Sequence, residues 1–176
     1  MELIKGGGAK NFIVDGTRLA VDERARPPFP IDVMIFEEDT NLVLTLDNVM
    51  IFQEEHPIRI MTEINRTQNQ RPGSLVINGS SWYAVTIDID RLPMCESQWI
   101  SDAYAAVFKA LEKKKINSAG IQILGSTHAN IPIEKTTKLF LDSFRYVKVK
   151  WPKYVWLCVS QDKVQMTRKH ILEYLR

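Results

Sequence analysis

This chain has few cysteines, a small net charge and no long apolar run, and each of these features argues against a class of protein. The 176 residues include two cysteines, Cys95 and Cys158, without cysteine or histidine neighbours, which argues against a zinc site and favours free thiols in a reducing compartment. The net charge of +2 is too small to predict nucleic-acid binding by itself. No apolar run is long enough to span a bilayer, and residues 1–8 lack the pattern of a signal peptide. We therefore expect a cytoplasmic protein with no metal, cofactor, membrane or nucleic-acid partner.

The composition is that of a folded domain, with 45% apolar and 25% charged residues. Two short apolar runs around Asp15-Gly16 predict a hairpin over residues 11–21. Downstream, strand patterns alternate with helix patterns, which predicts an α/β fold: a three-layer α/β/α domain with a mixed sheet over residues 31–176, after an N-terminal extension over residues 1–30. The predicted strands are 31–36, 42–46, 74–77, 82–89, 121–124 and 154–159, with an acidic turn at 37–41, and the predicted helices are 56–67, 96–115, one from Asn130 to about Phe144, and 162–175.

The stretch from Ile121 to Phe144 carries the first candidate site. A buried strand runs into Gly125-Ser126-Thr127-His128-Ala129-Asn130, and a helix follows with Asn130 placed as its N-cap and Glu134 in its first turn. Unpaired backbone N–H groups converge where a small-residue loop meets a helix N-terminus, so these six residues are candidate ligands for an anion, and His128 could contact the ligand. The same pattern also serves as an ordinary turn between a strand and a helix, and both interpretations stay open.

Three further features are weaker candidates. Asp47 and Asn48 follow the strand predicted at 42–46, at the end where α/β sheets bind ligands, although turns favour the same residues. Cys95 precedes a helix, which would lower its pKa, but no base is evident, and we predict no catalytic residue. Residues 148–154 alternate lysines with aromatics, a surface that can bind single-stranded nucleic acid, but an exposed loop has the same composition and we favour the loop.

Several of these segments resemble the macro domain family, whose members bind ADP-ribose. Leu124 to Pro132, reading LGSTHANIP, resembles the family's second phosphate loop, and residues 103–124, 73–76 and 82–87 are similar to the elements around it. Residues 42–48 resemble the strand that ends in an AIVNAAN-type motif, which implies that Asn48 faces the sugar of the ligand. The chain departs from the family at Val49 to His56, where bulky and acidic residues replace a glycine-rich loop, so the resemblance does not imply ADP-ribosyl hydrolysis.

Two functional hypotheses follow. The first is a non-catalytic, macro-like binding module for an ADP-ribose-type nucleotide or another phosphate-bearing ligand, held by Asp47, Asn48 and residues 125–130. The alternative is a scaffold or protein-interaction domain that keeps the fold without the pocket. In that case the N-terminal hairpin offers a strand edge for a homo-oligomer.

Overall fold

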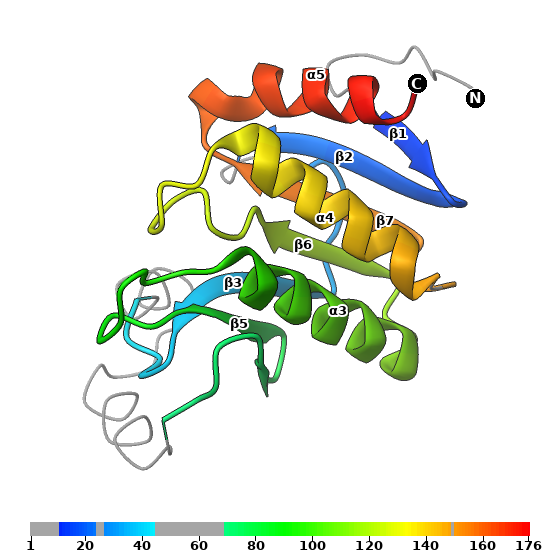
Figure 1. Cartoon of the computed structure of the whole chain (residues 1–176). Coiled ribbons are helices and arrows are strands. Elements are labelled where there is room, and N and C mark those ends of the chain that lie inside the picture. The colour runs from blue at the N-terminus through cyan, green and yellow to red at the C-terminus, as the bar shows by residue number, and fades with distance from the viewer. Residues whose placement is uncertain (1–10, 24–26, 45–68, 149) are drawn as a thin grey trace.

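The described residues of the computed structural model, 11–23, 27–44, 69–148 and 150–176, form a seven-stranded mixed sheet in the order β1-β2-β7-β6-β3-β5-β4. Strands β2, β7, β6, β3 and β5 are mutually parallel, while β1 and β4 run antiparallel at the two edges. Helices α3 and α4 pack on one face of the sheet, and α5 lies beside α4 over β2 (Figure 1). This arrangement confirms the predicted α/β fold with a mixed sheet, while the helix predicted at 56–67 lies outside the described residues.

The predicted hairpin is present. β1 spans Asn11–Val14 and β2 spans Thr17–Glu23, joined by Asp15 and Gly16 with φ of 47° and 85°. Two consecutive positive φ angles are the geometry that Asp-Gly favours in a two-residue hairpin loop. β2 also pairs in parallel with β7, from Arg18 opposite Tyr154 to Glu23 opposite Val159. The hairpin therefore extends the main sheet, and the division of the chain at residue 30 stays a prediction.

The third strand corrects the sequence analysis. β3 spans Val33–Asp39, so Glu37, Glu38 and Asp39 continue the strand instead of forming a solvated turn, and each is at most 2% exposed. The strand predicted at 42–46 is wrong for its described part, because residues 41–44 form a turn. The Asp39 carboxylate holds this turn by accepting the backbone N–H groups of Val43 and Leu44 at 3.2 and 3.1 Å. β3 is thus the strand that lies between β5 and β6.

The remaining elements follow the predicted order. They are β4 (Leu75–Asn78), β5 (Ser81–Ile87), α3 (Ser97–Lys114), β6 (Ser118–Gln122), α4 (Ile133–Val147), β7 (Tyr154–Val159) and α5 (Val164–Tyr174), the last preceded by a 3-10 turn at Gln161–Lys163. Of the aromatic side chains of α3, Tyr104 and Phe108 enter the core, while Trp99 is only half-buried. One local prediction is wrong: Asn130 does not cap α4, whose N-cap is Pro132, and instead adopts a left-handed φ of 51°.

An aromatic cluster fixes α4 against α3. Phe108 of α3 packs edge-on against Phe140 and Phe144 of α4, with ring centroids 5.7 and 5.1 Å apart, and Tyr104 packs edge-on against Phe140 at 5.4 Å. Edge-to-face pairs at these separations add to the free energy gained by burial. Because the rings interlock the two helices, the loop that leads into α4 has a fixed position relative to the sheet.

Candidate functional site

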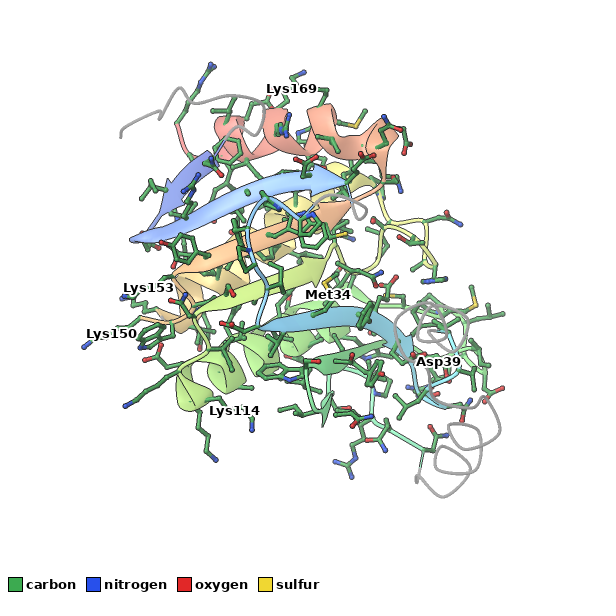
Figure 2. All side chains as sticks on the ribbon, turned by 180° about the vertical axis from the view of Figure 1, so that it is seen from behind. Met34, Asp39, Lys114, Lys150, Lys153 and Lys169 are labelled. Atoms are coloured by element: carbon green, nitrogen blue, oxygen red, sulfur yellow. The ribbon has the colours of Figure 1, made fainter. Side chains whose placement is uncertain are left out.

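The carboxyl ends of β3, β5 and β6 meet at one edge of the sheet, because these strands run parallel. We call this the carboxyl edge. In Figure 2, Asp39 marks the carboxyl edge, and Lys150 and Lys153 lie at the opposite one. Ligands of open α/β sheets bind outside the carboxyl ends of strands. Three segments meet here: Glu37 to Asp39 at the end of β3, Thr86 near the end of β5, and the 125–130 loop that follows β6.

The 125–130 loop is held at its start and open at its tip. Gly125 has a φ of 81°, and its carbonyl accepts the N–H of Ile131 at 2.9 Å, which closes the loop. The Ser126 hydroxyl donates to the carbonyl of Ile123, and the Lys163 ammonium donates to the carbonyl of Ser126 at 2.9 Å. Gly125 and Ser126 are buried, Ala129 is half-buried, and Thr127, His128 and Asn130 are exposed. The exposed tip can therefore meet a ligand.

Most backbone donors of this loop are unused. The N–H groups of Ser126, Thr127, Ala129 and Asn130 donate no hydrogen bond within the part of the chain that the structure describes. The loop runs directly into the N-terminus of α4, whose first N–H groups are also without intrahelical acceptors. A run of free N–H groups at the positive end of a helix dipole favours a bound anion.

The first N–H of the loop is already occupied. Gly125 donates it to Oε1 of Glu37, which also accepts the Thr86 hydroxyl at 3.1 Å. Glu37 is 2% exposed, and its other oxygen, Oε2, is buried without a hydrogen-bond partner among the described residues. Burial raises the pKa of Glu37 above its usual value of 4.5, while the hydrogen bonds from Gly125 and Thr86 and the nearby His128 oppose that rise. An internal carboxyl group thus lies against the loop where the sequence predicts an external anion.

Two further groups near Glu37, Tyr104 and Cys95, have raised pKa values. The backbone N–H of Leu124 donates to the Tyr104 hydroxyl at 2.9 Å, and complete burial raises the pKa of Tyr104. The pKa of Cys95 is raised to about 12, chiefly by burial and then by the charges of Glu37 and Glu96. The expectation that a following helix lowers the Cys95 pKa is therefore wrong, because desolvation outweighs the dipole. Neither group is arranged as a nucleophile.

Comparison with known proteins identifies the fold. No protein-family model matches the sequence, and no curated protein sequence matches it. Among solved structures, a variant of the Oceanobacillus iheyensis macrodomain superimposes with a TM-score of 0.77 at 10% identity, over 96% of this chain and 97% of that one. The same macrodomain with ADP gives 0.75 at 11% identity over 96% of both chains, and a Trypanosoma brucei macrodomain in complex with ADP-ribose gives 0.61 at 12% over 87% and 68%. The protein has the macrodomain fold.

The structure describes only some of the predicted site residues. Gly125 to Asn130 do form one loop at the carboxyl edge, after β6 and before α4. Asp47 and Asn48 lie outside the described residues. The strand that leads to the carboxyl edge between β5 and β6 is β3, ending at Asp39, and residues 42–44 form no part of it. The alignment of residues 42–48 with the family's motif, and the role of Asn48 that it implies, stay predictions.

Glu37 is the site residue that the sequence analysis missed in this macrodomain fold. Three consecutive acids favour a solvated turn, and only a partner can hold a carboxyl group inside a core. One signal was present: the apolar run Val33 to Phe36 meets the acids without an intervening glycine, proline or asparagine.

No three histidine, cysteine or acidic side chains of the described residues are placed to share a metal ion. No described helix combines the length and the apolar character that crossing a membrane requires.

Proposed function

We propose that the protein is a non-catalytic binding module of the macrodomain type, with its site at the carboxyl edge and a phosphate-bearing nucleotide of the ADP-ribose kind as its ligand. The observation that carries the proposal is the set of unused N–H groups in the loop before α4, those of Ser126, Thr127, Ala129 and Asn130. The N–H of His128 is directed at the Glu37 carboxyl group instead. The related folds offer a precedent for the ligand class, since the Oceanobacillus iheyensis and Trypanosoma brucei macrodomains have been solved with ADP and with ADP-ribose.

In this proposal the phosphate lies over the loop tip and accepts the free N–H groups, while Thr127 and His128 border it. The ammonium group of Lys163, already bonded to the Ser126 carbonyl, adds a positive charge behind the loop. Glu37 lies behind the loop, where its carboxyl group accepts the Gly125 N–H. Its protonated form tolerates an anion, whereas its ionised form would repel one, so the protonation of Glu37 sets how well the site accepts phosphate.

A thermal-shift titration with ADP-ribose tests the proposal. A ligand that binds only the folded state, present at one hundred times its Kd, adds about 2.7 kcal/mol to the free energy of unfolding. Thr127→Glu places a carboxylate at the exposed loop tip and is expected to weaken binding by about tenfold or more, or about 1.4 kcal/mol. Ser80→Glu adds the same charge to the exposed turn between β4 and β5, at the other end of β5, and should leave the affinity unchanged.

Two results would contradict the proposal. One is the absence of any shift with ADP-ribose, ADP or inorganic phosphate. The other is an equal loss of affinity in Thr127→Glu and Ser80→Glu, which would mean that the ligand responds to net charge and not to the loop. Release of ADP-ribose from a modified protein substrate would contradict the non-catalytic part alone.

One observation favours a second function, a protein-interaction domain that keeps the fold without the pocket. The Glu37 carboxyl group already bonds the Gly125 N–H, so an internal group fills part of the anion site. The edge strand β1, with Ile13 44% exposed, would then offer a surface for a second copy of the chain. This function predicts no nucleotide shift and a mass above that of the monomer, lowered by Ile13→Lys in light scattering. A monomeric mass for the unaltered protein would exclude it.

A further inference from the structure

Basic side chains gather at the edge of the sheet opposite the candidate site. The amino ends of β2, β6 and β7 and the last turns of α3 and α4 meet there. Figure 2 shows Lys114, Lys150 and Lys153 at this end and Asp39 at the other. We call the exposed cations of this region the basic edge: Arg18, Lys113, Lys114, Lys115, Lys148, Lys150 and Lys153.

Hydrogen bonds join the separate segments of the basic edge into one surface. The Glu112 carboxylate, near the end of α3, accepts the backbone N–H groups of Lys150 and Trp151 at 2.6 and 2.8 Å. The N–H of Lys153 donates to the carbonyl of Asn117 at 2.9 Å, and the N–H of Arg18 donates to the carbonyl of Lys153 at 2.8 Å. Cations from distant parts of the sequence are therefore held in a fixed arrangement.

The acids of this end are already engaged. Glu112 accepts the two N–H groups described above, Asp32 accepts the N–H of Ser118 at 2.8 Å, and Asp15 pairs with Arg145 at 4.0 Å. No cation of the basic edge forms an ion pair with an acid of the described residues. Helix dipoles account for Lys113 and Lys114 in the last turn of α3 and for Lys148 at the end of α4, but not for Lys150 and Lys153. The surplus of positive charge is thus available to a polyanion.

Aromatic rings lie among these cations. The Lys153 ammonium sits over the Trp151 ring, 5.1 Å from its centroid, and Tyr154 is 37% exposed beside Phe29. Tyr146, in the last turn of α4, is 82% exposed. Cations that follow a phosphate backbone, with flat rings between them on which bases can stack, are the two parts of a surface for single-stranded nucleic acid. We propose that the basic edge binds single-stranded RNA or DNA, with bases stacked on Tyr154 and Trp151.

An anionic membrane fits this surface less well. Insertion into a bilayer needs several protruding aliphatic side chains, and the exposed large apolar residues beside the lysines that follow α4 are tyrosines, Tyr146 and Tyr154. The aliphatic Ile13, which pairs with Arg18 across β1 and β2, is 44% exposed. The inference is independent of the carboxyl edge, since the two regions lie at opposite ends of the parallel strands. The inference also revises the expectation, drawn from a net charge of +2, that the protein has no nucleic-acid partner. A net charge does not show that positive and negative side chains gather at opposite ends of the strands.

The test is binding of a fluorescent 20-nucleotide oligo(U) to the full chain by fluorescence anisotropy over a range of salt concentrations. Each cation that neutralises a phosphate of a single strand contributes about 0.7 to the slope of log K against log salt, so the double variant Lys150→Gln, Lys153→Gln should lower the slope by about 1.4. The matched control, Lys138→Gln with Lys169→Gln, removes the same charge from exposed positions on α4 and α5 and should leave the slope unchanged.

Tyr154→Leu separates stacking from charge, because it keeps every cation. It is expected to weaken oligo(U) binding about fivefold or more while leaving the affinity for inorganic polyphosphate unchanged. The inference is overturned if oligo(U) shows no saturable binding at low salt, or if the control pair lowers the slope as much as the variant pair. It is also overturned if phosphatidylserine vesicles bind as tightly as oligo(U) and Tyr154→Leu changes neither affinity.

Discussion

Replacing Glu37 by glutamine tests the central observation, a carboxyl group buried against the 125–130 loop. The change keeps the size of the side chain, and the amide oxygen can still accept the Gly125 N–H and the Thr86 hydroxyl, as Oε1 does. The amide nitrogen takes the place of Oε2, which has no hydrogen-bond partner within the described chain. At low pH both proteins carry a donor at this position, the O–H of the protonated carboxyl group or the NH2 of the amide, so their stabilities should differ by no more than about 1–3 kcal/mol.

The two proteins should differ in how their stability depends on pH. Burial raises the pKa of Glu37 in the folded state, while the unfolded chain keeps the usual value of 4.5. Between these two pKa values the unfolded state releases a proton that the folded state retains, so the free energy of unfolding falls as pH rises, by up to about 1.4 kcal/mol per pH unit. Glutamine does not titrate. The stability of Glu37→Gln relative to the unaltered protein should therefore rise from pH 4.5 until the folded pKa is passed, and then level off.

The assay is urea denaturation of both proteins at half-unit steps from pH 4.5 to pH 8, followed by fluorescence. Glu134→Gln removes the same charge from an exposed position in the first turn of α4 and controls for the change in net charge. A constant difference between Glu37→Gln and the unaltered protein across this range would refute the reasoning. It would mean that water reaches the carboxylate and that the group does not lie sealed against the loop.

Three further outcomes are expected. The affinity for ADP-ribose, measured by calorimetry, should weaken as pH rises through the Glu37 pKa and should lose this dependence in Glu37→Gln; a flat profile in both would place the ligand elsewhere. Gly125→Ala should destabilise the fold more than Gly16→Ala does, by about 1–3 kcal/mol in urea. Both glycines have positive φ, but a Cβ at Gly125 would lie 2.5 Å from Cδ1 of Ile100, while nothing lies within 4 Å of one at Gly16; equal losses would disprove the clash. Cys95, with a pKa of about 12, should react with iodoacetamide at pH 8 about a hundredfold more slowly in the folded protein than in urea, as followed by peptide mass spectrometry, and equal rates would contradict its burial.

Local patterns were enough to predict most of the elements. The Asp15-Gly16 hairpin and the apolar strand Tyr154–Val159 were read directly from the sequence, and the helix predicted at 96–115 agrees with α3 to within a residue at each end. The loop from Gly125 to Asn130 was predicted as well, because small residues between a strand and a helix have few other structures. These features depend on neighbours in the sequence, and so the sequence specifies them.

The side chains that line the candidate site could not be predicted from local patterns. Glu37 looks like a surface residue until the backbone N–H of Gly125, 88 residues away, is brought against it. The Asn130 cap failed for a related reason. The bond from Ile131 to Gly125 closes the loop early and Asn130 is left-handed, so that the N-cap falls two residues later, at Pro132.

The sequence by itself determined where the chain forms strands, helices and tight turns, and which family its loop resembles. Only the tertiary structure decided which charged side chains are buried and which lie together on one surface. The seven cations of the basic edge come from three separate segments, and Glu37 of β3 is sealed by Thr86 of β5 and by the loop after β6. The physical reason is that burial and charge density depend on neighbours in space, and parallel strands bring distant residues together at their two ends.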